Sequence, residues 1–265
     1  MIRELMSKQA IETQLAALGF ACADPAFSTS DDAAARMQIS VKDPHIHTFG
    51  VYEDDAPSAA FAFLISEAER YLELIAAVYA SGGACDRMFD WVRERYAGFR
   101  ADFVFRPENV LLREALRRKG ATFYPEQQRM TLAAKKPGID TFGVEPLSER
   151  FREQYIAMHD LDCYWTGERV AAALDRFRVY LAIQNDRVVG YLDTVDGYVE
   201  DILVQKEHRN RGWGRKLLAC AIAENPDGMS LEVDIENLPA CALYTSLGFQ
   251  PVPGENTVTA TWEIS

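Results

Sequence analysis

Two segments of this 265-residue chain recur with nearly the same separation. The run Tyr71–Ile75 (Tyr-Leu-Glu-Leu-Ile) matches the run Tyr198–Ile202 (Tyr-Val-Glu-Asp-Ile), which begins 127 residues later. An asparagine followed 11 residues later by glycine occurs at Asn109 and again at Asn237, an offset of 128 residues. Because the two matches keep the same order and nearly the same spacing, the pattern predicts a duplicated unit of about half the chain.

Both halves alternate short apolar strands with amphipathic helices. In the first half we expect helices near 11–18, 86–96 and 110–119, and strands near 48–52, 59–65, 71–79, 102–105 and 128–132. In the second half we expect strands at 142–144, 179–183, 187–192, 198–204, 229–235 and 258–264, and helices at 149–159, 167–177, 214–223 and 239–247. Asn185-Asp186 predicts the turn of a hairpin. Interleaved helices and strands indicate the α/β class, with a mixed central sheet flanked by helices in each half.

The division between the halves is predicted at a polar stretch that contains both Pro and Gly, Lys135-Lys136-Pro137-Gly138. We therefore expect two domains, residues 1–136 and 137–265.

The charge of the chain limits its partners. The formal net charge is −12, which disfavours nucleic acid and favours cationic small molecules. No run approaches the roughly 18 apolar residues of a membrane helix, and the N-terminus lacks the pattern of a secretory signal. The five scattered cysteines form no Cys-x-x-Cys pair. They indicate free thiols in a cytoplasmic protein, and no metal site is expected.

The sharpest local pattern lies between a predicted strand and a predicted helix, in the segment 204–216. It contains Gly212 and Gly214, and glycine lets backbone amides approach a ligand with no Cβ in the way. The helix start adds free N–H groups and a partial positive charge. The basic residues of the segment, against one acid, are Lys206, Arg209, Arg211, Arg215 and Lys216. The combination is typical of a phosphate site, although its spacing fits neither the dinucleotide fingerprint nor a Walker loop.

The order Arg209-x-x-Gly212-x-Gly214 resembles the pyrophosphate-binding motif of the GNAT acetyltransferase superfamily. Asn237, Tyr244 and the sequence Leu247-Gly248-Phe249 are similar to the next motif of that family, at its usual distance. The resemblance covers about residues 142–264. It implies a mixed sheet whose fourth and fifth strands splay apart, with acetyl-CoA as co-substrate in the cleft between them. It also implies direct transfer of an acetyl group to an amine.

The resemblance assigns roles to individual residues. The pyrophosphate would be held by backbone amides of Arg209, Asn210, Arg211, Gly212, Trp213, Gly214 and Arg215. The main chain of Leu203 and Val204 would pair with the pantetheine arm, and an amide near Val204 would face the thioester oxygen. Asn237 would contact the pantetheine arm. Tyr244 would protonate the leaving thiolate.

The acceptor amine, with a pKa of about 10, must lose a proton before it reacts. Glu200 and Asp201 offer two carboxylates on the strand that faces the cleft, and strand alternation predicts that they lie on opposite faces. The segment is similar to the Tyr-Leu-Glu-Asp run of GNAT polyamine acetyltransferases, in which the glutamate is the proposed base. We therefore favour Glu200 over Asp201 as the base.

The first half lacks the features that predict this site. At the repeat offsets, Arg209 falls on Gly82, Gly212 on Cys85 and Tyr244 on Leu116. The half therefore resembles a degenerate GNAT domain. The leading interpretation is one working site that acetylates a small, cationic amine. A protein or peptide acceptor and a non-catalytic CoA-binding regulatory module are the alternatives, and monomer and homodimer both stay open.

Overall fold

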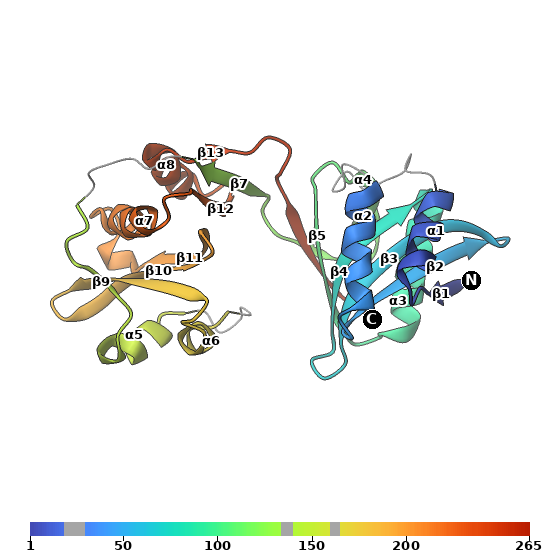
Figure 1. Ribbon diagram of the computed structural model, residues 1–265, viewed down its shortest axis with the longest axis horizontal. Helices are drawn as coiled ribbons and strands as arrows, with labels where there is room; N and C mark the ends of the chain where they lie inside the picture. The colour runs from blue at the N-terminus through green and yellow to red at the C-terminus, as the bar shows by residue number, and fades with distance from the viewer. Residues whose placement is uncertain (19–29, 134–139, 160–164) are drawn as a thin grey trace. The chain divides into compact units, whose positions relative to one another are not determined.

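The computed structural model describes residues 1–18, 30–133, 140–159 and 165–265, in two compact units (Figure 1). Unit 1 comprises residues 1–126 and 256–265, and unit 2 comprises residues 127–255. Each unit contains one seven-stranded mixed sheet with helices beside it, so the predicted α/β class is confirmed. The segment Lys135–Gly138, where we expected the boundary, lies outside the described residues.

The sheet of unit 1 has the strand order β1-β2-β3-β4-β5-β14-β6. Its strands are β1 (Ile2–Glu4), β2 (Ile46–Glu53), β3 (Ala56–Ser66), β4 (Tyr71–Tyr79), β5 (Arg100–Phe105), β6 (Thr122–Phe123) and β14 (Val258–Glu263). Its helices are α1 (Lys8–Leu18), α2 (Ser30–Met37), the 3-10 turn η2 (Gln38–Val41), α3 (Gly82–Arg95) and α4 (Val110–Arg118).

The sheet of unit 2 has the order β8-β9-β10-β11-β12-β7-β13. Its strands are β7 (Gln127–Leu132), β8 (Val144–Pro146), β9 (Phe177–Gln184), β10 (Arg187–Val195), β11 (Tyr198–Val204), β12 (Met229–Asp234) and β13 (Gln250–Pro251). Its helices are α5 (Arg152–Ile156), α6 (Gly167–Ala172), α7 (Trp213–Glu224) and α8 (Leu238–Leu247), with 3-10 turns η3 (Glu149–Phe151) and η4 (Lys206–His208).

The two sheets have matching orders in which one strand of each half is exchanged. β7, from the first half of the sequence, lies antiparallel to β12, with Met229 opposite Leu132 (green β7 in Figure 1). β14, from the second half, lies antiparallel to β5, with Val258 opposite Phe105. The structure therefore differs from the division that we expected between residues 136 and 137, because β7 belongs to unit 2 and β14 belongs to unit 1. Apolar alternation marks each segment as a half-buried strand, but it does not say which of two duplicated sheets accepts it.

The duplication itself is visible in equivalent elements of the two units. β4 begins at Tyr71 and β11 begins at Tyr198, as the repeated sequence predicts. Asn109 is the N-cap of α4 and Asn237 is the N-cap of α8. Both asparagines accept a backbone N–H of the following helix, which explains why this residue type recurs at that position.

Helices cover both faces of the sheet in unit 2. On one face α7 and α8 bury an apolar cluster that includes Leu217, Leu218 and Ile222, as predicted. On the other face α5 and α6 cover a second cluster that includes Phe151 and Tyr155. These two helices are shorter than we expected, because the chain turns at Ile156 and again before β9. Both faces of the sheet in unit 2 are thus packed against helices.

Several features bear on cofactors and partners. The described thiols, Cys85, Cys220 and Cys241, form no disulfide bond with one another, whereas Cys22 and Cys163 lie outside the described residues. Within the described residues, no three His, Cys, Asp or Glu side chains group as a metal ion requires. None of the helices in the described ranges has the length and apolar character of a membrane span.

Candidate active site

β11 and β12 diverge shortly after they begin. Their parallel register consists of two pairs, Tyr198 with Ser230 and Val199 with Leu231. Beyond these pairs β11 continues beside β10 and β12 continues beside β7. The sheet therefore opens between its two parallel strands, which is the splayed arrangement that the sequence resemblance implies.

An uncapped helix start borders this opening. After β11 the chain forms η4, passes Asn210 with φ of 60°, and enters α7 at Trp213. Gly212, the N-cap residue, has φ of 84°, a left-handed conformation that favours glycine. No side chain caps the helix. The first N–H groups of α7 therefore keep their capacity to bind an anion.

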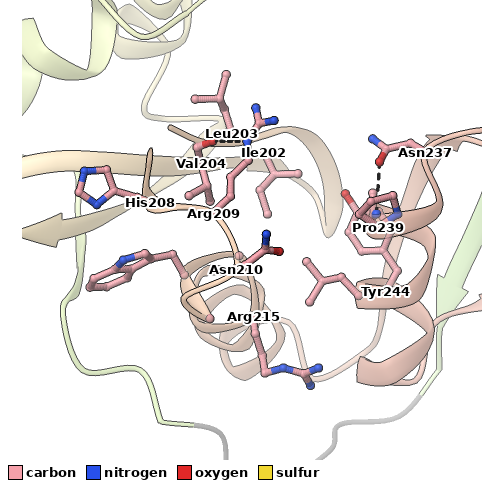
Figure 2. A pocket seen from close by; sticks show the side chains of 15 residues that line it. Ile202, Leu203, Val204, His208, Arg209, Asn210, Arg215, Asn237, Pro239 and Tyr244 are labelled. Carbon is pink, nitrogen blue, oxygen red and sulfur yellow. Dashed lines mark hydrogen bonds between the residues drawn. The ribbon is translucent and has the colours of Figure 1, made fainter. Parts of the chain in front are cut away.

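A cleft with a volume of about 630 Å³ lies between β11, the loop and α8 (Figure 2). It is lined by Ile202, Leu203, Val204, His208, Arg209, Asn210, Gly212, Trp213, Gly214, Arg215, Asn237, Pro239, Ala240, Leu243 and Tyr244. Tyr244 and every predicted cofactor-binding residue except Arg211 are in this set. Glu200 and Asp201 are not. The structure thus brings the predicted phosphate loop and the predicted acid together around one cleft.

The basic side chains of the loop and of the first turn of α7 point in different directions. Arg209 Nε donates to the main-chain oxygen of Val204 at 2.9 Å, and this bond ties the loop to the end of β11 (Figure 2). Arg215 Nη2 donates to Ser246 Oγ at 2.7 Å. Lys216 instead has its Nζ 2.8 Å from Asp140 Oδ2. Arg209 and Arg215 are therefore the two arginines that line the cleft, and Lys216 is directed toward the segment before β8.

α8 supplies the opposite wall of the cleft. The side-chain oxygen of Asn237 accepts the N–H of Ala240 at 3.3 Å, and both residues border the cleft. Tyr244 is 5% exposed and packs edge-on against Phe249. Burial raises the pKa of Tyr244 to about 12, and the nearby charge of Asp201 contributes to the rise. The phenol therefore stays protonated near neutral pH and is able to donate its proton.

Glu200 and Asp201 occupy a β-bulge in β11. Asp201 pairs with Asp193 of β10 and Val199 pairs with Thr194, which leaves Glu200 without a partner in β10. The strict alternation by which we expected to separate the two carboxylates therefore does not apply here. Burial raises the pKa of Glu200, and the negative charges of Asp201 and Asp193 raise it further.

A buried polar cluster, which we define as Tyr155, His159, Tyr191 and Asp193, lies beside the bulge. The Tyr155 hydroxyl donates to Asp193 Oδ2 at 2.8 Å, and His159 Nε2 is 3.2 Å from the same oxygen. The His159 ring stacks on Tyr191, whose hydroxyl donates to Asp201. Sequence analysis missed this cluster. Its available signal was Asp193, an acid within a strand that is otherwise buried, because a buried carboxylate needs polar partners.

The corresponding region of unit 1 is organised differently. β4 and β5 share four residue pairs, from Tyr71 to Leu74, and β4 then continues beside β3 to Tyr79. Tyr79, at the end of β4, donates its hydroxyl to the side-chain oxygen of Asn109 at 3.1 Å. The start of α3 is capped, because the Ser81 hydroxyl accepts the N–H of Ala84. The helix start that no side chain caps in unit 2 is therefore capped in unit 1.

Comparison with known proteins shows which protein family the residues around the cleft resemble. Residues 144–249 match the acetyltransferase (GNAT) family. A stretch of 70 residues is 37% identical to the uncharacterized N-acetyltransferase YobR of Bacillus subtilis (strain 168). That match covers 24% of this chain and 28% of YobR, so the similarity extends over only about a quarter of the relative's length.

Solved structures of similar fold match nearly the whole chain. A tandem GNAT protein from the clavulanic acid biosynthesis pathway, solved without AcCoA, has a TM-score of 0.58 at 13% identity, covering 100% of this chain and 98% of that one. A GCN5-related N-acetyltransferase from Sphaerobacter thermophilus has a TM-score of 0.68 at 13% identity, covering 100% and 95%. At such identities the likeness concerns the fold. Residues 144–249 are therefore similar in sequence to the acetyltransferase (GNAT) family, and the chain has a fold similar to that of a tandem GNAT protein.

Proposed function

We propose that the protein transfers the acetyl group of acetyl-CoA directly to the amine of a small, cationic acceptor. The observation that carries this proposal is the cleft of unit 2, where splayed strands and an uncapped helix start face Tyr244. The N–H groups from Arg209 to Arg215, Arg211 included, suit a pyrophosphate. The main chain of Leu203 and Val204 suits the amide groups of a pantetheine arm.

The contacts of Arg209 indicate how the cleft would accommodate this donor. Its guanidinium donates to the main-chain oxygen of Val204. Strand-like pairing with pantetheine would use the same oxygen as its acceptor. We therefore expect Arg209 to exchange this oxygen for a phosphate oxygen, with which a guanidinium forms stronger, charge-assisted bonds. Asn237 would contact the pantetheine arm from the opposite wall. A single rearranged side chain would thus open the strand edge and add a phosphate contact.

The proposed reaction uses one base and one acid. Glu200 takes a proton from the acceptor ammonium, through water because its carboxylate does not line the cleft. The neutral nitrogen attacks the carbonyl carbon, the carbon–sulfur bond breaks, and the leaving thiolate takes the proton of Tyr244. The proton that the nitrogen loses as the amide forms returns to the Tyr244 oxygen through solvent. A main-chain N–H near Val204 would donate to the carbonyl oxygen. The raised pKa of Glu200 and the protonated phenol of Tyr244 support these assignments.

The acceptor class is inferred from charge. The chain carries a net charge of −12, and Glu200, Asp201 and Asp193 gather beside the opening in the sheet. Such a field attracts a cationic amine and repels nucleic acid. A small molecule is favoured over a peptide because the sequence shows no docking groove. We further propose that unit 1 binds no CoA, since the start of its equivalent helix is capped by the Ser81 hydroxyl.

Calorimetric titration of acetyl-CoA into the full chain tests the proposal, followed by thiol release with small diamines and with N-terminal peptides. We expect one site per chain and turnover with diamines. Two sites would show that unit 1 also binds, and peptide turnover alone would move the acceptor class to proteins. Binding without turnover of any amine would favour a regulatory CoA-binding module. Absence of binding would remove the acetyl-CoA proposal.

A further inference from the structure

We propose that Tyr191 is a positioning residue for the reaction, which holds Asp201 as a fixed negative charge beside Glu200 so that Glu200, and not Asp201, receives the proton. The inference rests on the function proposed above. It changes the role of Asp201, which sequence reasoning treated as a second candidate base.

The ring of Tyr191 is fixed by its neighbours in the buried polar cluster. Tyr191 is 1% exposed. Its ring stacks on His159 with centroids 4.2 Å apart and meets Tyr155 edge-on at 5.4 Å. The hydroxyl at the end of this immobilised ring donates to the carboxylate of Asp201, a residue that is otherwise exposed. A rigid donor thus determines where the Asp201 charge stands.

The two neighbouring acids differ in their hydrogen bonds. The Asp201 carboxylate accepts the hydroxyl of Tyr191, whose ring is held by His159. Glu200 has the opposite surroundings. It is the unpartnered residue of the bulge, and no hydrogen bond to its carboxylate is found among the described residues. Of the two neighbouring acids, Glu200 is therefore the one whose carboxylate is not engaged by a tyrosine hydroxyl.

The position of Asp201 affects both proposed catalytic groups. With burial and Asp193, its charge raises the pKa of Glu200, which makes Glu200 a stronger base toward an ammonium. The same charge contributes to the raised pKa of Tyr244, which favours the protonated phenol. One immobile carboxylate thus supports proton acceptance by Glu200 and keeps Tyr244 ready to donate.

Other titratable groups near Glu200 come from every strand beside it. Asp193 of β10 is itself held by Tyr155 and His159 on the α5 side. Tyr198 of β11 senses the charges of Glu200, Glu232 of β12 and Arg129 of β7. Among these, Asp201 and Asp193 are the two charges that act on Glu200. Asp201 is the exposed one, and an asparagine in its place removes the charge while it keeps an acceptor oxygen for the Tyr191 hydroxyl.

The test compares Tyr191→Phe, Asp201→Asn and the double variant. Tyr180→Phe is the matched control, because the Tyr180 hydroxyl also donates to a carboxylate, Glu224, at 2.8 Å in the same sheet. The readouts are the pH profile of kcat/KM and the titration of the Glu200 carboxyl by carbon-13 NMR, assigned with Glu200→Gln. The NMR titration needs no turnover, so it decides this inference even if the proposed activity fails.

Asp201→Asn should move the acidic limb of the profile, and the Glu200 titration, to lower pH by about one unit, because a negative neighbour is lost. Tyr191→Phe should move the acidic limb and the Glu200 titration to lower pH as well, but by less than Asp201→Asn does. It should also lower kcat severalfold and leave the KM for acetyl-CoA unchanged. In the Asp201→Asn background, Tyr191→Phe should add nothing, and Tyr180→Phe should move neither readout. The proposal would be overturned if Tyr191→Phe lowered kcat equally with and without Asp201→Asn, or if the Glu200 titration did not move in Asp201→Asn.

Discussion

Asn109 and Asn237 hold the same position in the two units, and each accepts a backbone N–H at the start of the following helix. They differ in what lies beside them. Asn109 is 3% exposed and also accepts the Tyr79 hydroxyl, whereas Asn237 borders the cleft. One duplicated residue thus contributes to the core of unit 1 and to the wall of the cleft in unit 2.

Alanine at these two positions should therefore have different effects. Asn109→Ala should lower the free energy of unfolding by about 2–3 kcal/mol, because it removes a helix cap and a buried acceptor. Asn237→Ala should cost about 1 kcal/mol, the value of a cap alone, and should weaken acetyl-CoA binding. Urea unfolding and calorimetry measure both effects. Weaker acetyl-CoA binding by Asn109→Ala would contradict the assignment of the site to unit 2.

Tyr244→Phe should reduce kcat roughly 100-fold, because it removes the proposed proton donor to the leaving thiolate. The dissociation constant of acetyl-CoA should change little, since the ring and its contact with Phe249 remain. Steady-state kinetics and calorimetry separate the two quantities. Unchanged turnover would exclude Tyr244 from the chemistry.

Glu200→Gln should abolish the acidic limb of the pH profile and lower kcat/KM roughly 100-fold at neutral pH. In the unsubstituted protein, Glu200 is inactive as a base when protonated, so activity rises with pH through its pKa. Burial and two acidic neighbours raise that pKa above its ordinary value, so the limb should lie above the range of an exposed glutamate. Glu145→Gln, at an exposed position of β8, is the control. A limb that persists in Glu200→Gln would assign the base elsewhere.

Arg215→Gln and Arg211→Gln test which arginines act in the cleft. Arg215, in the first turn of α7, lines the cleft, and Arg211, in the loop before that helix, does not. Loss of a charge-assisted bond to phosphate should raise the dissociation constant of acetyl-CoA about tenfold in Arg215→Gln. Arg211→Gln should have little effect, because the contact proposed for Arg211 uses its backbone. Calorimetry at one salt concentration compares them, and equal effects would point to general attraction by charge.

Gly212→Ala and Gly254→Ala separate backbone strain from ligand contact. Both glycines have left-handed φ values, 84° and 75°, and an added Cβ at either position meets no atom within 4 Å. Each alanine should therefore cost about 1–2 kcal/mol of stability. Only Gly212→Ala should weaken acetyl-CoA binding, because its Cβ would enter the space assigned to the pyrophosphate. Thermal unfolding and calorimetry give the two readouts, and equal binding by both variants would place the pyrophosphate elsewhere.

The repeated and periodic parts of the sequence predicted much of this structure. β4 and β11 have the bounds expected from their apolar runs, and the two asparagines mark equivalent helix starts. The loop from Arg209 to Arg215 combines glycine and charge at a strand end, a local pattern with a direct structural meaning. Such signals arise within a few residues, so they are readable before any tertiary contact is known.

The remaining features depend on contacts between distant residues. The bulge at Glu200 is defined by the register of β10, so strict alternation is no guide to the faces on which the two acids lie. Tyr191 and His159 stack across 32 positions of sequence, and neither residue type alone indicates such a pair. The exchange of β7 and β14 depends on which of two similar sheet positions each strand reaches. Pairing choices of this kind are made by the whole fold and leave no local pattern.

The position of β14 also orders events during synthesis. β5 of unit 1 emerges from the ribosome early, yet its neighbour in the sheet consists of residues 258–263. The sheet of unit 1 is therefore complete only after the second half of the chain has been translated. A polypeptide cut between the halves would leave each part without one strand and with an open edge, which is prone to pair with other chains. Circular permutants that begin at residue 256 would place β14 ahead of unit 1, and should let that unit complete its sheet first.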